Sequence, residues 1–466
     1  MHGDEWEGTD GALRVIEHLA TATDPATLAL LDRTRIYFNV TANPDGRNAG
    51  TRANAAGFDL NRDFATASQP ETRAMRGIAL ATQPLVMLDE HGYTGDTLIE
   101  PATAPHGQNY EYDLYIKHAY ANALGMEAAV KALGHAETES VTIPFRDLPP
   151  GDWDDWPPIF TPMNVMYHGA VGHTVEIPLR VNRAAYTGLP ESELRRRSAI
   201  NTDVAAATIG AAITYTDTHR DALIADQIEL FRRGAAGEAQ RFIPDGYVPG
   251  FGPEDRYSTT FARAWVIPAG PGQRSDVAAA RLVDMLVDND IRVTRAHRGF
   301  TLGGRAYPAG SYVVDMHQPK RGLAAALLEA GGDVSQRVPQ MYDISGWSLG
   351  LLWGATVDQV ASGPVRVPGS PVVAAAPTGR VDAAPGQDLA IAVRDGKDVQ
   401  AVNDLLGRGL PLRRAADGSI IAPADTRAAV LEVADRYGVR FTAAPAGTSG
   451  TPCARRSSRA RSPPTS

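Results

Sequence analysis

Short apolar runs alternate with amphipathic stretches between Leu13 and about Ile209, and this alternation constrains the fold more than any other feature. Strand-like runs cover Arg35–Val40, Leu85–Asp89 and Gly172–Ile177, and a helical stretch covers Asp113–Leu133. Such alternation is typical of α/β folds with a parallel or mixed sheet. We therefore predict an α/β layer fold with a largely parallel or mixed sheet, followed by smaller α/β repeats.

The chain has 466 residues, which is too long for one ordinary domain. A helical stretch over Glu191–Phe231 precedes a Gly/Pro-rich segment, and a second Pro/Ala/Gly-rich stretch follows residue 361. The predicted parts are a first domain over 1–235, an accessory α/β domain over 255–361, a second repeat-like α/β unit over 386–443 and a disordered tail over 444–466. The two repeats share a β-α-β-β-α order and contain no cluster of acids, bases and ligands, so we assign them a packing or substrate-orienting role.

Charge and hydropathy exclude several classes of partner. The formal net charge is −9 and the pI is near 5.7, which gives no general attraction to nucleic acid or anionic lipid. No apolar run approaches the roughly 20 residues that span a bilayer, so we expect no membrane segment. The single Cys453 excludes an intrachain disulfide, and it leaves the compartment open.

Three residues have the types and the spacing of a zinc site. His2 and Glu5 form an H-x-x-E pair that can face one way on a single turn, and His91 follows in Asp89–Gly92. Catalytic zinc takes three ligands from His and carboxylate and leaves a fourth position open. The H-x-x-E pair alone would equally suit a solvated surface helix.

The segments between these ligands carry a family resemblance. Asn43–Gly46, Arg52–Phe64 and Pro70–Ala74 occur in that order between the H-x-x-E pair and His91. The sequence over roughly residues 1–180 resembles the zinc carboxypeptidase family, which includes pancreatic carboxypeptidases A and B. The resemblance implies a three-layer α/β/α fold with a central mixed sheet, one Zn²⁺ per chain and hydrolysis of peptide or protein C-termini.

The resemblance also implies a role for each site residue. His2, Glu5 and His91 would be the metal ligands, and Glu176 would be the general base. Asn61 and Arg62 would hold the C-terminal carboxylate of the substrate, and Arg52 would steady the scissile carbonyl. An alternative reading, from the residues alone, is that Arg52 and Arg62 pair with Asp59 or Asp63. His168 and His173 are expected to be structural or pocket-lining, and His106, His118 and His135 to be solvated.

The sequence departs from the family pattern in two places. Asp4 stands where pancreatic members carry a basic residue, and Asp152–Trp156 stands where they carry a mobile Tyr. Tyr167 is then the candidate for the substrate-binding tyrosine. Residues 157–170 are expected to line the side-chain pocket.

The beginning of the chain departs as well, because the family has strands before the first zinc motif. We expect an upstream segment to be missing, and the chain as given has no signal peptide. Bacterial relatives with added C-terminal domains imply an extracellular location. Two other functions stay open: a zinc amidase or peptidase acting on cell-wall peptides, and a non-catalytic remnant or binding protein.

Overall fold

The structure is a computed structural model, and contacts divide the chain into two compact units. The first unit holds residues 1–263, 289–292 and 315–348, and the second holds 264–288, 293–314 and 349–466. The structure describes residues 2–101, 109–149, 153, 158–181, 188–244, 246–249, 258–333, 348–377, 379–445 and 447–453. The domain limits expected from the sequence stay a prediction.

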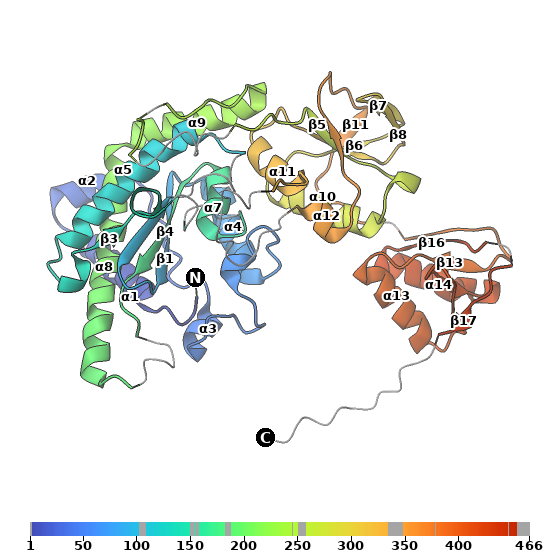
Figure 1. Cartoon of the computed structure of the whole chain (residues 1–466), viewed down its shortest axis with the longest axis horizontal. Coiled ribbons are helices and arrows are strands. Elements are labelled where there is room, and N and C mark those ends of the chain that lie inside the picture. The colour runs from blue at the N-terminus through green and yellow to red at the C-terminus, as the bar shows by residue number, and fades with distance from the viewer. Residues whose placement is uncertain are drawn as a thin grey trace. The chain divides into compact units, whose positions relative to one another are not determined.

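A four-stranded mixed sheet lies at the centre of the first unit (Figure 1). Its order is β1-β4-β2-β3, with β1 at Val86–Gly92, β2 at Thr97–Pro101, β3 at Val141–Thr142 and β4 at Val171–Ile177. Strand β4 is parallel to β1 and antiparallel to β2, and β2 is parallel to β3. This confirms the predicted mixed α/β character.

Helices pack against this sheet. Helix α5 (Tyr112–Lys131) contacts β2 and β4, and α8 (Glu191–Thr218) contacts β1 and β4. The short helix α7 (Thr161–Val165) also packs against β4. It comes so close that a Cβ atom at Gly172 would lie 2.7 Å from the Pro162 carbonyl oxygen, which explains the glycine in that strand. The remaining helices of this unit are α1 (Glu7–Thr21), α2 (Pro25–Arg33), α3 (Pro44–Ala49), α4 (Pro70–Thr82), α6 (Pro144–Asp147), α9 (Arg220–Ala236) and α11 (Arg321–Leu328).

The sequence explains where two of these helices begin. Asp24 accepts a hydrogen bond from the Thr27 N–H at the start of α2, and Asn43 accepts one from the Gly46 N–H at the start of α3. A proline occupies the first turn of both helices, where no backbone donor is needed. Both caps are standard start signals.

One expectation about secondary structure is wrong. Residues 35–40 form no strand, because no strand among the described residues pairs with them, and Tyr37 is 59% exposed. An extended segment needs a partner for its backbone groups before it becomes a sheet strand. The predicted helical stretch Glu191–Phe231 is confirmed. It consists of two helices, α8 and α9, because the backbone leaves helical geometry at His219 (φ −108°, ψ 14°).

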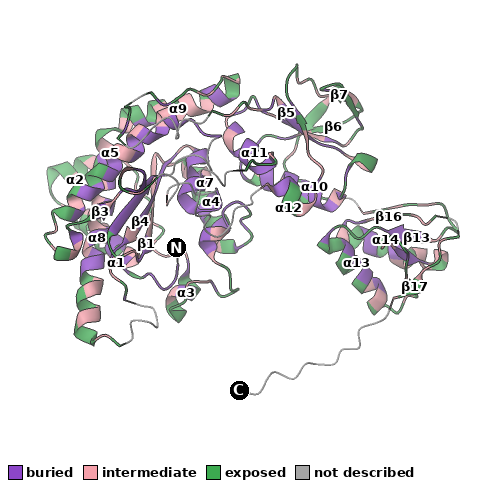
Figure 2. Ribbon diagram, in the orientation of Figure 1, coloured by how far each residue is buried: buried purple, intermediate pink, exposed green. Residues whose placement is uncertain are grey.

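The core of the first unit lies between the sheet and its helices (Figure 2). Ile99 of β2, Val175 of β4, and Ile116 and Met126 of α5 have no exposed surface. Burial of such side chains contributes about 1.5–3 kcal/mol each. The sheet is therefore a fixed platform for the polar residues at the ends of its strands.

The second unit contains mostly antiparallel sheets. One is five-stranded, in the order β10-β5-β9-β6-β11, one is six-stranded, in the order β12-β16-β13-β15-β14-β17, and β7 and β8 form a hairpin. Its helices are α10 (Asp276–Asp288), α12 (Leu349–Trp353), α13 (Gly396–Gly407) and α14 (Arg427–Tyr437). The strands are β5 (Ala264–Ile267), β6 (Thr294–Ala296), β7 (Phe300–Leu302), β8 (Arg305–Tyr307), β9 (Tyr312–Asp315), β10 (Asp358–Val360), β11 (Gly369–Pro371), β12 (Arg380–Asp382), β13 (Leu389–Ile391), β14 (Arg413–Arg414), β15 (Ile420–Ala422), β16 (Arg440–Ala443) and β17 (Thr451–Pro452). Across the described ranges of both units, the helices are all too short or too polar to span a bilayer.

Candidate metal centre

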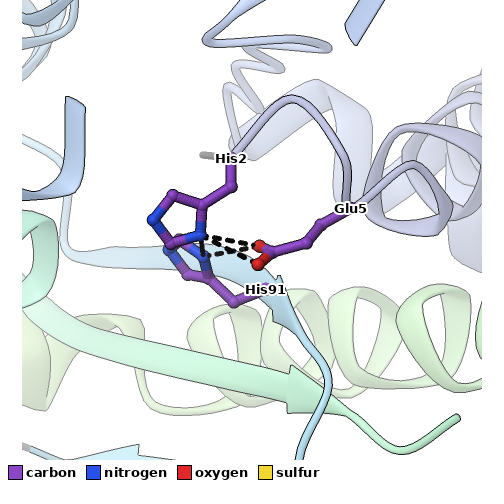
Figure 3. A group of neighbouring side chains, drawn as sticks. All are labelled: His2, Glu5 and His91. Carbon is purple, nitrogen blue, oxygen red and sulfur yellow. Dashed lines mark hydrogen bonds and ion pairs between the residues drawn. The ribbon is translucent and has the colours of Figure 1, made fainter. Parts of the chain in front are cut away.

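His2, Glu5 and His91 converge on one point (Figure 3). His2 and Glu5 lie on the turn before α1, where the Glu5 N–H contacts the His2 carbonyl oxygen at 3.4 Å, and His91 lies near the end of β1. Nδ1 of His2 is 2.9 Å from Glu5 Oε1, Nδ1 of His91 is 2.9 Å from Glu5 Oε2, and the two Nδ1 atoms are 3.1 Å apart. All three residues are buried.

This donor set fits zinc. Two imidazole nitrogens and one carboxylate form a recognised ligand set of catalytic zinc, with ligand bonds of about 2.0–2.2 Å. Donor atoms about 3 Å apart suit a shared ion at that bond length. Two ring nitrogens 3.1 Å apart need a proton or a cation between them, since two lone pairs would repel.

The opposite ring nitrogens of both histidines face carboxylates. His2 Nε2 is 3.2 Å from Asp59 Oδ1, and His91 Nε2 is 2.9 Å from Asp89 Oδ2. A carboxylate on Nε2 keeps the proton there and leaves the Nδ1 lone pair for a metal. Burial alone would raise the pKa of Asp59 and Asp89, yet the neighbouring His2 and His91 hold the pKa of each well below its usual range.

Asp59 is a residue whose role the sequence analysis missed, because it appeared there only as an ion-pair partner. Besides His2, it accepts the Arg52 Nε–H at 2.8 Å and the Asn61 backbone N–H at 2.9 Å. The sequence feature that could have indicated this role is the position of Asp59 within the Arg52–Phe64 segment. The single carboxylate links a candidate metal ligand, His2, to two proposed substrate contacts, Arg52 and Asn61.

The turn that carries the first two ligands is held by a close backbone contact. A Cβ atom at Gly3 would lie 2.1 Å from the carbonyl carbon of Gly46, which no side chain could tolerate. Arg47 adds a hydrogen bond from its NH1 to the Trp6 carbonyl oxygen at 3.0 Å. The start of helix α3 at Asn43–Gly46 therefore supports the His2–Glu5 turn directly.

Glu176 lies on β4 beside the candidate metal ligands. In the parallel register of β1 and β4 it is the partner of His91, and Thr174 is the partner of Asp89. Burial raises the pKa of Glu176 to about 7, and the nearby carboxylates of Glu5 and Asp89 also raise it, against the lowering effect of His91. A carboxyl group that titrates near neutral pH can both take up and release a proton.

Two of the three proposed substrate residues, Arg52 and Asn61, lie next to the candidate ligands. Arg52 NH1 is 3.3 Å from His2 Nδ1, and Asn61 Nδ2 is 3.3 Å from His91 Nε2. The guanidinium of Arg62 stacks on the Phe160 ring, with Cζ 4.3 Å from the ring centroid. The structure also agrees with the alternative interpretation of Arg52, because this residue forms an ion pair with Asp59.

Tyr167 lies in the interior of the first unit. It is 3% exposed, and its ring packs edge-on against Tyr110 with 5.5 Å between centroids. Together with Asn109 and Gly322 it lines a small cavity, and its hydroxyl has no hydrogen-bond partner within the described part of the chain. Its substrate-binding role stays a prediction, and residues 152 and 154–156 lie outside the described residues.

The first part of the chain is similar to known proteins. Residues 1–157 match the zinc carboxypeptidase family model. Mouse carboxypeptidase M is 37% identical over 93 residues, covering 16% of this chain and 21% of that protein. Human carboxypeptidase D is 39% identical over 87 residues, covering 16% of this chain and 6% of that protein. The chain thus spans about a fifth or less of the length of these relatives.

One solved structure, a proposed metallopeptidase from Shewanella denitrificans, is 20% identical and covers 46% of this chain and 71% of that one, with a TM-score of 0.29. A similarity this low carries no argument. Residues 1–157 belong to the zinc carboxypeptidase family, a family of metallopeptidase hydrolases. Glu176 and Tyr167 lie beyond the matched residues.

Proposed function

We propose that the chain is a zinc-dependent metallocarboxypeptidase that binds one Zn²⁺ and hydrolyses the C-terminal peptide bond of peptides or proteins. The observation that carries this proposal is the buried cluster of His2, Glu5 and His91, with a carboxylate behind each histidine. The family match over residues 1–157 supports it.

The proposed ligands are His2 Nδ1, a Glu5 carboxylate oxygen and His91 Nδ1. A zinc ion held there would supply Lewis-acid activation of a water molecule at neutral pH. Glu176 would take a proton from that water on its carboxylate and pass it to the leaving amine. Its pKa of about 7 in the metal-free chain suits both transfers.

Arg62 and Asn61 would select a chain end over an internal bond. A guanidinium is planar and always charged, so Arg62 can hold a free carboxylate through two parallel hydrogen bonds. The Phe160 ring under Arg62 would keep that plane oriented. Arg52 would place a positive charge beside the carbonyl oxygen as negative charge develops on it.

We further propose the three-layer α/β/α architecture and an extracellular location for this enzyme. The layers are supported by contacts on both faces of β1, whose successive side chains point to opposite faces. On one face, Glu90 accepts a hydrogen bond from the Thr208 hydroxyl of α8 at 3.0 Å. On the other face, Asp89 receives a hydrogen bond from Thr161 of α7. The extracellular location rests on the family resemblance.

Metal content and C-terminal release test the proposal together. Purified protein should contain one zinc per chain by mass spectrometry and should release residues from peptides with a free C-terminal carboxylate but not from their amides. His91→Ala should lose the metal, whereas Glu176→Gln should keep it and lose activity by at least about 100-fold. His135→Ala, which changes a half-exposed histidine bonded to Asp203, is the matched control and should behave as wild type.

Equal cleavage of free and amidated peptides would contradict the carboxypeptidase assignment while leaving a zinc peptidase. Zinc binding without any peptide hydrolysis would contradict the catalytic assignment itself. A wild-type chain that binds no zinc would contradict the whole proposal.

A further inference from the structure

Thr161 lies between the metal side and the substrate side of the candidate site. It is the first residue of α7 and is 1% exposed. Its backbone nitrogen and its hydroxyl both lie 3.1 Å from Asn61 Oδ1. Its hydroxyl also makes a hydrogen bond with Asp89, the residue that faces Nε2 of His91.

The contact with Thr161 fixes which way the Asn61 amide points. A backbone N–H can only donate, so the Asn61 atom that faces it must be the oxygen. The Asn61 NH₂ group is therefore turned toward His91, where Nδ2 is 3.3 Å from Nε2. Because Nε2 carries the proton that faces Asp89, it cannot accept from Asn61, and the amide hydrogens are presented to the site.

The number of available hydrogens decides which acceptor the Thr161 hydroxyl donates to. It has one hydrogen and two neighbouring acceptors, Asn61 Oδ1 and the Asp89 carboxylate. Asn61 already receives the Thr161 backbone N–H, and a hydrogen bond to a carboxylate is roughly twice as strong as one between neutral groups. The hydroxyl therefore donates to Asp89, while the backbone holds Asn61.

The segment that carries Thr161 is itself held firmly. The Phe64 N–H donates to the Ile159 carbonyl oxygen at 3.1 Å, and Phe160 stacks under Arg62. On the other side, α7 is pressed against β4 at Gly172. Thr161 thus occupies a fixed point between the loop that carries Asn61 and the strand that carries His91.

We infer that Thr161 is a positioning residue that acts through Asp89 on the metal ligand His91 and through Asn61 on the substrate carboxylate. The inference rests on the proposed carboxypeptidase function. Residues behind metal ligands typically change metal affinity or activity by about 10–100-fold when they are lost. A purely structural threonine would change only the stability of the fold.

Thr161→Val tests the hydroxyl, because valine has nearly the same shape and keeps the backbone N–H. We expect zinc affinity, measured by competition with a chromogenic chelator, to fall about tenfold. We expect KM for a peptide with a free C-terminus to stay within about twofold of the wild-type value, because valine keeps the backbone N–H that holds Asn61. Thr161→Ser should restore the zinc affinity. Thr138→Val is the matched control, since this buried threonine donates to the His135 carbonyl oxygen.

Wild-type zinc affinity in Thr161→Val, even with a lower Tm, would overturn the inference. If the valine variant does not fold, Thr161→Ala removes the same hydroxyl without adding bulk and carries the same test. A wild-type chain that binds zinc but hydrolyses no peptide would contradict the proposed function, while the zinc affinities of the variants would still decide the role of Thr161 toward His91.

Discussion

Asp59 and His2 face each other across 3.2 Å, between the carboxylate oxygen Oδ1 and the ring nitrogen Nε2. The other oxygen of Asp59 accepts the Nε–H of Arg52 at 2.8 Å. One side chain therefore orients a proposed zinc ligand and the arginine proposed to stabilise the oxyanion. A carboxylate in this place also makes the His2 ring a stronger electron donor.

Asp59→Asn should lower zinc affinity by about 10–100-fold, because the amide keeps the shape but loses the charge that holds the His2 proton. The measurement is competition with a chelator of known affinity. Asp63→Asn is the control: Asp63 accepts from the backbone N–H groups of Ser68 and Gln69, so it should lower Tm and leave zinc affinity unchanged. Equal zinc affinities for Asp59→Asn and wild type would refute the orienting role of Asp59.

Arg62→Lys should raise KM at least about tenfold for peptides with a free C-terminus, with a smaller change in kcat. Lysine keeps the charge but lacks the planar fork and the stacking surface over Phe160. Steady-state kinetics on a free peptide and on its amide would show reduced discrimination between the two. An unchanged KM would remove Arg62 from carboxylate binding.

Stability of the metal-free chain should depend on pH through Glu176. Burial raises its folded pKa to about 7, above the unfolded value of about 4.3. The folded state then binds the proton more tightly, so this stabilisation is complete below about pH 4 and is lost as pH rises through 7. Glu176→Gln should remove a loss of up to about 3 kcal/mol, measured by urea unfolding at pH 5 and pH 8 with chelator present. Parallel pH profiles for the two proteins would contradict the raised pKa.

Gly3→Ala should abolish zinc binding or weaken it at least about 100-fold, since the new Cβ atom would meet the Gly46 backbone at 2.1 Å and displace the His2–Glu5 turn. Gly77→Ala, in helix α4 with no atom within 4 Å of the added Cβ, is the control and should be neutral or slightly stabilising. The zinc content of both variants, measured by mass spectrometry, tests this prediction. Full zinc occupancy in Gly3→Ala would show that the turn can shift without loss of the ligands.

The sequence was most informative where chemistry and local spacing coincide. The H-x-x-E pair and His91 are brought together in the structure, and β1 and β4 lie where apolar runs predicted strands. Residues 35–40 have the same strand-like pattern but no partner strand among the described residues. A pattern records the tendency of a segment, whereas a sheet also needs a neighbour.

Long-range contacts explain the other differences. His118 was expected to be solvated, yet it is 5% exposed and bonded to Tyr215 at 2.9 Å and Asp226 at 2.8 Å. These partners are 97 and 108 residues away in the chain, so no local pattern could indicate them. The roles of Asp59 and Thr161 were hidden for the same reason: each contacts a ligand segment from which it is distant in sequence.

The pairing of His91 with Glu176 across β1 and β4 has an evolutionary consequence. Side chains on a strand alternate between faces, so a deletion of one residue within either strand would turn every later side chain to the opposite face. A deletion in β4 before Glu176 would turn its side chain toward the face that α8 covers, while its sequence neighbours were unchanged. Insertions and deletions should therefore be tolerated in the connections after β1 and before β4, and they should be selected against inside the two strands.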